Sequence, residues 1–401
     1  MSESVPSATE KRPRLKFIDM SRSLAILLML EGHFTGAALA NEYRKDDYLL
    51  YKIWHNIHGL TSPLFFTVTG VIFVYLLSVN NNISYFHNTR VKKGFKRVLE
   101  LLFWGYFIQL SLWSIIQSFY YGSKFHLEWF YAFHVLQSIG VGIFFLLAIY
   151  GIFKWINKGA LYWYYLVSGL LLFIGYSCMK NYIQMDEQAI ADGLQKGPKY
   201  FPHNAPAFIQ NMFYGKYSDF SFLRYSGYTI LGGMLGSIIR TYENKTKEWW
   251  FGTTFLVAGI FISLFIQPIF RSIDHFTEWI ALTEKGVYEL NATAFIRFGQ
   301  VVSVLGFFML IDKYVDVKAK LYLKLGQNTL PIYVVHVIIL YGGIFGIGLK
   351  PLIFDENLGP WIAAGISAVA ILFFTLMVHY IELLEEKYDA FIRIFTFKKK
   401  K

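Results

Sequence analysis

Repeated long apolar segments constrain this chain more than any other feature of its sequence. Each is long enough to cross the hydrocarbon core of a bilayer as an α-helix, which takes about 20 residues. Only 16% of the 401 residues are charged, against about 25% in soluble proteins. Because lipid offers no hydrogen-bond partners to the backbone, segments of this kind are helical. The sequence therefore predicts an all-α, polytopic integral membrane protein.

About ten spans follow from these segments. They cover residues 17–40, 59–79, 98–118, 131–152, 159–179, 222–240, 249–268, 293–312, 325–347 and 360–383. An even number places both termini on one side of the membrane. We expect residues 1–15 to form a tail, 16–385 the membrane domain with an external loop at 180–221, and 386–401 a basic tail.

The distribution of Lys and Arg predicts which side that is. The two tails and the connections on the same side carry 25 of the 38 Lys and Arg residues. Short loops rich in positive charge stay in the cytoplasm, so both termini are expected to be cytoplasmic. This placement also accounts for the net charge of +11 without a nucleic acid partner. Mostly short loops and a short N-terminal tail favour a bacterial inner (plasma) membrane, and with Cys178 as the single cysteine no intramolecular disulfide can form.

The first span carries ionisable residues that a passive membrane anchor would not need. Arg22 and His33 stand eleven residues apart, which puts them on one face of a helix, about 16 Å apart along its axis. Ionisable groups at membrane depth usually face a cavity or a partner and point to function. The alternative is structural, with Arg22 reaching the headgroups and His33 buried in the core. A neutral imidazole suits a general base at neutral pH.

Two further histidines open the second span. His55 and His58 lie in WHNIHGLTSP, at the depth of His33, and helices joined by a short loop are usually neighbours. We therefore expect the three histidines to converge. A metal site is an alternative, but the segment has neither a zinc-binding His motif nor Cys/His spacing, so no metal is expected.

A basic segment precedes the third span. Arg90, Lys93 and Arg97 follow helical spacing and share one face. Such a face suits the phosphates of a nucleotide-bearing substrate, and the alternative is anchoring to anionic lipid. Polar side chains also occur inside later spans: Gln137 in the fourth, Asn328 and His336 in the ninth, where Pro331 is expected to break the helix. Each can contact substrate or simply join two helices by a hydrogen bond.

Several of these segments resemble one superfamily. RLKFIDMSRSLAILLMLEGHF and GLTSPLFFTVTG resemble the opening of the transmembrane acyltransferases. FHVLQSIGVG, GYTILGGMLGS and LGQNTLPIYVVH are most similar to the heparan-alpha-glucosaminide N-acetyltransferase-like family, and the spacing from Arg22 to His33 resembles the arginine–histidine motif of the acyltransferase-three family. The resemblance covers about residues 15 to 345.

The resemblance implies an enzyme that moves an acyl group from cytoplasmic acyl-CoA to a glycan beyond the membrane. The acyltransferase-three pattern implies that His33 is catalytic and that Arg22 belongs to the donor site. The heparan-family pattern points instead to His55 or His58 as the active histidine. Lys93 and Arg97 stand where related enzymes hold the donor.

Our expectation is an acyltransferase that uses acetyl-CoA as co-substrate, in a lipid bilayer, with a glycan hydroxyl or amine as acceptor. His33 or His58 would act as general base, Gln137 or Asn328 would stabilise the oxyanion, and His55 and His336 would contact substrate. An acyl-histidine intermediate is an alternative to direct transfer. A homodimer is compatible with the sequence. The second hypothesis is a transporter or flippase of a small anionic or glycan substrate, which would also place polar groups at the midplane of the membrane. The third hypothesis is a non-catalytic membrane scaffold.

Overall fold

The computed structural model describes residues 15–45, 47–78, 83–122, 128–191, 200–280, 292–383 and 386, apart from some side chains near the end of α7. This part of the chain is helical, with two isolated β-bridges. The α-helices are α1 (Lys16–Ala38), α2 (Leu49–His58), α3 (Thr61–Leu77), α4 (Thr89–Phe107), α5 (Leu112–Tyr120), α6 (Val135–Ile156), α7 (Leu161–Ala191), α8 (Ala207–Phe213), α9 (Phe222–Thr241), α10 (Trp249–Trp279), α11 (Ala292–Tyr314), α12 (Lys320–Gln327), α13 (Thr329–Tyr341) and α14 (Pro360–His379). Short 3-10 or π turns lie at Asn41–Tyr43, Tyr85–His87, Glu128–Tyr131, Glu243–Lys245, Gly343–Phe345 and Lys350–Phe354.

Six helical segments of this part are long and apolar enough to cross a membrane. They are Leu49–Leu77, Val135–Ile156, Leu161–Lys180, Trp249–Trp279, Ala292–Tyr314 and Pro360–His379. The number rises to eight if α4 with α5 (bent by 41°) and α12 with the helical segment from Thr329 (bent by 76°) each form one span. The predicted all-α, polytopic membrane protein is confirmed. The ten predicted spans also include α1 and α9, which are 23 and 20 residues long but too polar to be counted by composition.

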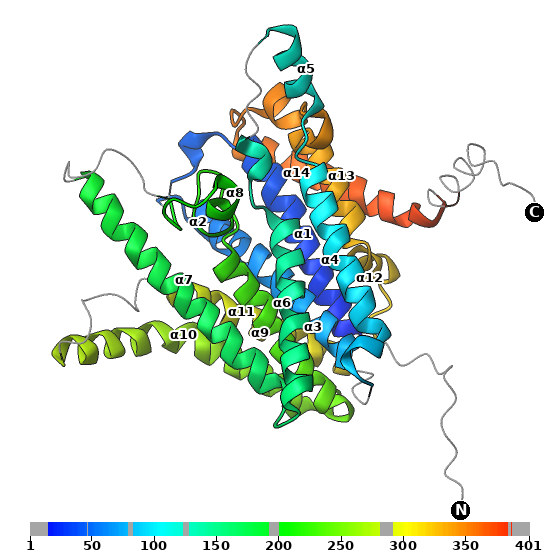
Figure 1. Ribbon diagram of the computed structural model, residues 1–401. Helices are drawn as coiled ribbons and strands as arrows, with labels where there is room; N and C mark the ends of the chain where they lie inside the picture. Colours follow the sequence, from blue (N-terminus) through cyan, green and yellow to red (C-terminus); the bar gives the residue numbers. More distant parts are fainter. Residues whose placement is uncertain are drawn as a thin grey trace, which may run out of the picture.

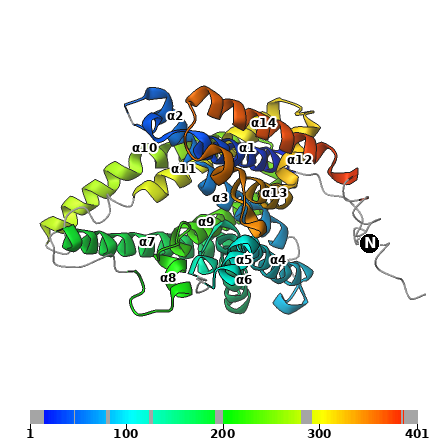
Figure 2. The same cartoon turned by 90° about the horizontal axis from the view of Figure 1, so that it is seen from above.

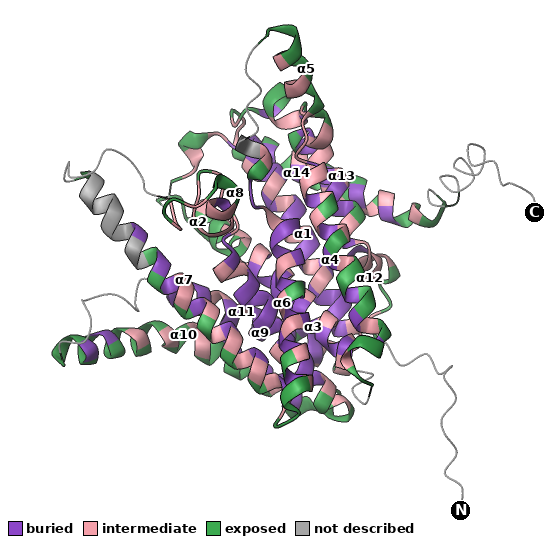
Figure 3. Cartoon of the chain, viewed as in Figure 1, coloured by how far each residue is buried: buried purple, intermediate pink, exposed green. Residues whose placement is uncertain are grey.

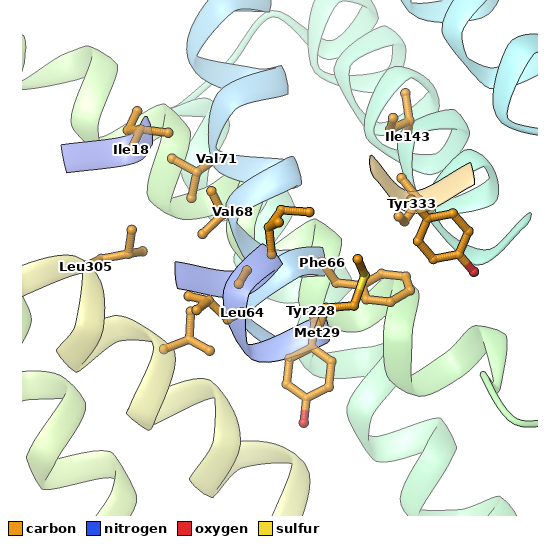
Figure 4. Close-up of a cluster of buried hydrophobic side chains, with 14 of the residues drawn as sticks. Ile18, Met29, Leu64, Phe66, Val68, Val71, Ile143, Tyr228, Leu305 and Tyr333 are labelled. Carbon is orange, nitrogen blue, oxygen red and sulfur yellow. The ribbon is translucent and has the colours of Figure 1, made fainter. Parts of the chain in front are cut away.

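Most of the long helices run side by side in a bundle with α1 inside it, whereas α7 and α10 project obliquely away from it (Figures 1 and 2). Helix α1 packs against α3, α11, α12 and α14. Figure 3 shows the consequence: α1, α3 and α9 are largely buried, whereas much of α10 is exposed. Figure 4 shows part of the core, in which apolar side chains from α1, α3, α9 and α11 meet. Burying a polar helix such as α1 at the centre requires partners for its polar groups, and the neighbouring helices supply them.

Glycines bring α3 and α9 close together. A Cβ added to Gly70 of α3 would lie 1.9 Å from the carbonyl oxygen of Thr229, and one added to Gly232 of α9 would lie 2.0 Å from that of Thr67. Small residues allow this approach, which is typical of helix pairs in membranes. The sequence GYTILGGMLGS is therefore a packing motif, as its glycines indicate.

The C-terminal end of α1 is fixed by the segment that precedes α14. The Arg44 guanidinium donates to the carbonyl oxygens of Gly36 and Leu39, and the N–H groups of Glu356 and Leu358 donate to carbonyls of the last turn. Cations and donors at this end satisfy the free carbonyls and oppose the helix dipole. At the N-terminal end of α1, Lys16 pairs with Asp316, which follows α11, and Lys324 of α12 pairs with Glu382, which follows α14. Which side of the membrane this end faces stays a prediction.

Three expectations about the elements need correction. The second span begins earlier than residue 59, since α2 runs directly into α3 at a turn formed by Gly59 and Leu60. The basic segment expected to precede the third span belongs to its helix: α4 begins at Thr89 and not at residue 98, and Asn88 caps it, its side chain accepting a hydrogen bond from the N–H of Arg90. The loop 180–221 contains the end of α7 and all of α8. Residues 1–14 and 387–401 of the two predicted tails lie outside the described part.

The predicted break in the ninth span lies at Asn328, and Pro331 is not its centre. Asn328 separates α12 from α13, and Pro331 falls in the first turn of α13. A proline there removes no intrahelical hydrogen bond, because the first N–H groups of a helix have no partner within it. At its other end α13 stops at Gly342, whose φ of 90° is a left-handed conformation that favours glycine. The helix is thus short and ends sharply on both sides.

Candidate active site

His33 of α1 lies against His336 of α13. The Nδ1 atom of His33 is 3.0 Å from the Nε2 atom of His336, and Nδ1 of His336 is 3.3 Å from the carbonyl oxygen of Ile332. His336 is fully buried, with 0% of its surface exposed. The ring of Tyr333 meets the His336 ring edge-on at 5.0 Å. The structure thus joins α1 to α13 through a pair of imidazoles.

His58 of α2 also lies close to His33. Its ring centre is 6.4 Å from that of His33, and it stacks on Trp54 at 5.4 Å. Trp54 in turn donates its Nε1–H to Glu31 over 2.8 Å. The ring lies so close to α1 that a Cβ at Gly32 would come within 1.8 Å of His58 Nδ1. Gly32 is therefore the residue that lets α2 place His58 beside His33.

The expected convergence of three histidines is correct for His33 and His58 but wrong for His55. The His55 ring is on an exposed part of α2 and stacks on Tyr51. On a helix, residues three apart lie about 60° from each other, and α2 turns His58 inward and His55 outward. The third imidazole beside His33 is His336, which comes from α13, far along the chain.

His33 lines a cavity of about 650 Å³, which we call the histidine cavity. Its wall also includes Gln137, Tyr333, Tyr341 and Leu136. Gln137 is 1% exposed, and neither its Nε2 nor its Oε1 has a hydrogen-bond partner among the described residues. Buried amides normally have partners, so this amide is available to a molecule that enters the cavity. His58 and His336 are not part of the wall.

A second cavity of about 260 Å³ lies toward the N-terminal end of α1, and we call it the basic cavity. Four cationic side chains line it: Arg22, Arg90, Lys93 and Arg97. The rest of the lining is mostly apolar, from α3, α4, α6 and α13. The structure therefore brings together the predicted donor residues of two separate helices and adds Arg90. Cations beside an apolar wall suit a molecule with an anionic head and a long, uncharged arm.

Contacts on the wall of the basic cavity orient two of these cations. Arg22 Nη2 donates to Thr329 Oγ1 over 3.1 Å, at the first turn of α13. Arg97 Nη1 pairs with Glu100 one turn along α4 over 2.9 Å. The N-terminal end of a helix favours negative charge, so α13 adds to the attraction of Arg22 for an anion.

A family model for an acyltransferase domain, that of the acyltransferase-three family, matches residues 15–380, nearly the whole chain. The chain belongs to this family. It is a membrane acyltransferase, and an acyl donor is implied. No curated protein matches the chain. The match is to the family whose arginine–histidine motif Arg22 and His33 resemble.

The two cavities of this acyltransferase meet at two side chains. Leu136 of α6 and Tyr333 of α13 line both of them. Tyr333 is 7% exposed, and Figure 4 shows it at the margin of the buried cluster with its hydroxyl directed away from the cluster. Arg22 and His33 thus face the same side of α1, as their spacing predicts, and their cavities share the two lining side chains of Leu136 and Tyr333, which we call the partition.

Asn328 does not line either cavity of the acyltransferase. Its Nδ2–H donates to the carbonyl oxygen of Lys324 over 2.9 Å, at the break between α12 and α13. The amide therefore serves the end of α12, and of the two oxyanion candidates only Gln137 faces a cavity.

Sequence reasoning placed Tyr333 among the polar groups of the ninth span, but it did not identify Tyr341 or Glu31 as parts of the site. Tyr341 lies 6.1 Å from His33 between ring centres, and Glu31 holds Trp54 behind His58. Asp219 was also missed; it pairs with His134 at 3.4 Å on the wall of the histidine cavity. For Glu31 a signal existed, since an acid within a membrane helix needs a partner. Tyr and Asp residues in loops or aromatic-rich helices carry no such signal in a single sequence.

Proposed function

We propose that this acyltransferase moves an acetyl group from acetyl-CoA, held in the basic cavity, to a hydroxyl or amine of a glycan in the histidine cavity. One observation carries the proposal. Arg22 and His33 line two adjacent cavities whose common wall contains Leu136 and Tyr333. A donor bound at one and an acceptor bound at the other would meet at that wall.

The basic cavity supports a CoA donor. CoA carries several phosphate charges, and Arg22, Arg90, Lys93 and Arg97 supply four cations. Guanidinium groups bind phosphate oxygens in pairs, whereas lysine acts as a point charge. The apolar part of the lining suits the pantetheine arm, which is long and thin. By the positive-inside rule this end of the bundle faces the cytoplasm, where acyl-CoA is made.

The histidine cavity supports proton removal from the acceptor. His33 belongs to its wall and His58 does not, so we assign the general base to His33. A histidine near the acceptor O–H or N–H removes the proton as the oxygen or nitrogen attacks the thioester carbonyl. The buried amide N–H of Gln137 would donate to the oxyanion that forms. This assignment follows the acyltransferase-three pattern, and it does not use the heparan-family pattern.

Acyl transfer by the purified protein in nanodiscs tests the proposal. The probes are radiolabelled acetyl-CoA and a panel of neutral and amino sugars. We expect His33→Gln to lower transfer at least about 10²-fold, the range of a lost general base, and His58→Gln to lower it much less. CoA should still raise the unfolding temperature of His33→Gln, because His33 is remote from the basic cavity, but not that of Lys93→Gln combined with Arg97→Gln.

Two outcomes would contradict the proposal. If His33→Gln transfers acetyl at the wild-type rate, the base is elsewhere. If the wild-type protein neither transfers acetyl nor gains stability from CoA, but moves a sugar or anion across the bilayer of proteoliposomes, the transporter reading is correct.

A further inference from the structure

The burial of the His336 side chain argues against its predicted contact with substrate. It is 0% exposed and belongs to neither cavity wall. Its two ring nitrogens both have partners: the carbonyl oxygen of Ile332 at 3.3 Å and Nδ1 of His33 at 3.0 Å. A side chain placed in this way acts on its neighbours, and its neighbour is the proposed base.

The partners of His336 determine which of its nitrogens carries hydrogen. A carbonyl oxygen only accepts, so Nδ1 of His336 must donate to Ile332. In a neutral imidazole the other nitrogen is then an acceptor, and among the described residues no acid pairs with His336 that would favour its charged form. Protonating a fully buried imidazole that has no ion-pair partner is strongly unfavourable. Nε2 of His336 is therefore the acceptor.

The same reasoning fixes the proton on His33. Since Nε2 of His336 accepts, Nδ1 of His33 must donate to it across 3.0 Å. The lone pair of His33 is then on Nε2, for which no hydrogen bond exists among the described residues. The other nearby titratable rings, His58 at 6.4 Å and Tyr341 at 6.1 Å, only make ring contacts with His33. Within the described part of the chain, His336 is therefore the only group whose hydrogen bond selects the tautomer of His33.

We propose that His336 is a positioning residue: its hydrogen bond to Nδ1 of His33 holds the imidazole with its basic Nε2 free for the acceptor. This inference rests on the proposed function. In the reaction the acceptor proton moves to Nε2 of His33 as the acceptor bonds to the thioester carbonyl carbon. The C–S bond then breaks, and the CoA sulfur takes that proton. The Nδ1–H bond to His336 is unchanged throughout, so it supports the imidazolium as well as the neutral ring.

Two substitutions at position 336 separate this role from simple packing. In His336→Gln the side-chain Oε1 reaches about the place of Nε2 and accepts from His33. In His336→Leu the volume is similar but no acceptor remains. With radiolabelled acetyl-CoA we expect the Leu variant to lose about 10²-fold or more in kcat, as when a base takes the wrong tautomer. The KM for acetyl-CoA should not change, and the Gln variant should stay within about tenfold of wild type.

Equal losses in the Gln and Leu variants, or a loss that appears in KM alone, would overturn this role for His336. Thermal unfolding in detergent shows whether each variant folds. If the Leu variant does not fold, His336→Asn replaces it, because its amide is too short to reach His33. If His33→Gln is inactive and His336→Leu is fully active, the proposed function stands and this inference fails. If wild type transfers no acetyl group, both fail.

Discussion

Gln137 is buried, and neither polar atom of its side chain has a hydrogen-bond partner among the described residues. It lies on α6 next to the partition residue Leu136, and Gly105 of α4 packs directly against its side chain. A buried amide without hydrogen bonds costs about 1–3 kcal/mol. Residues that lower the stability of a fold are expected at functional sites. We therefore expect the Gln137 amide to act in the reaction.

Replacing Gln137 by Leu should therefore change stability and activity in opposite directions. We expect a free energy of unfolding equal to or above that of the wild type, because the unpaired amide is gone, and a kcat about 10² to 10³ lower, as for a lost oxyanion donor. Thermal unfolding and acetyl transfer measure the two effects.

Gln109→Leu is the matched control for this variant. Gln109 lines the same cavity, but its Nε2–H donates to the carbonyl oxygen of Ala132, so its loss should affect kcat much less. If Gln137→Leu keeps full activity, Gln137 has no part in the chemistry.

At the scale of the helices, the C-terminal end of α1 is stabilised by Arg44 and by the segment that precedes α14. Arg44 contacts the last carbonyls of α1 and also lies 3.7 Å from Glu356. Glu356 makes a closer pair with Lys350, at 2.9 Å. These ion pairs hold the segment before α14 against the end of α1, and His33 is within two turns of that end. Their strength should therefore depend on the charge of Glu356.

The pH dependence of stability tests this element. The hydrogen bond from Lys350, together with the charge of Arg44, lowers the pKa of Glu356. A lowered pKa means that the carboxylate stabilises the fold fully above the unfolded-state pKa of about 4.3, and that this stabilisation is lost as the pH falls through the lower folded value. We expect Glu356→Gln to cost less than about 1 kcal/mol at pH 7, because the pair is partly exposed to solvent.

Thermal unfolding of wild type and Glu356→Gln at pH 7 and at about pH 4 measures this effect, with His55→Gln as an exposed control on α2. The difference between wild type and Glu356→Gln should shrink at the lower pH. A difference that grows on acidification would contradict the assigned ion pairs.

At the scale of the whole molecule, the two cavities lie along one side of α1 and share the side chains of Leu136 and Tyr333. Under the proposed function, the thioester carbonyl reaches this shared wall and meets the acceptor there. Bulky side chains at the meeting point would leave little room for water, which limits hydrolysis of the donor when no acceptor is bound.

Removing the Tyr333 ring from the partition should increase hydrolysis of acetyl-CoA in the absence of an acceptor. We expect Tyr333→Ala to raise CoA release from acetyl-CoA without acceptor about tenfold or more, because water reaches the carbonyl more easily. Tyr333→Phe keeps the ring and should behave as wild type. A thiol reagent that detects free CoA gives the rate. If Tyr333→Ala releases CoA no faster than wild type, the ring is not a barrier to water.

Local spacing predicted the features that one helix contains by itself. The shared face of Arg22 and His33, and the basic face of Arg90, Lys93 and Arg97, follow from helical geometry alone. The location of the cations at one cavity and of His33 at the next agrees with those predictions. The position of His58 beside His33 also follows, since α1 and α2 are neighbours in the chain.

Contacts between distant segments could not be predicted in the same way. His336 is 303 residues from its partner His33, and a single sequence does not show which of several later histidines returns to α1. The choice between His55 and His58 depends on the rotation of α2, which Gly32 and Trp54 determine through packing. The break at Asn328 lies three residues before Pro331, because a proline fits the first turn of a new helix. Tertiary packing decided each of these.

The two sharp ends of α13 have a mechanical consequence. Asn328 and Gly342 are both held by backbone hydrogen bonds, and between them α13 carries Thr329, Tyr333 and His336. Thr329 accepts from Arg22, Tyr333 lines both cavities and His336 contacts His33. One short helix therefore fixes the spacing of all three contacts. Under the proposed function, it keeps the donor site and the base in register with each other.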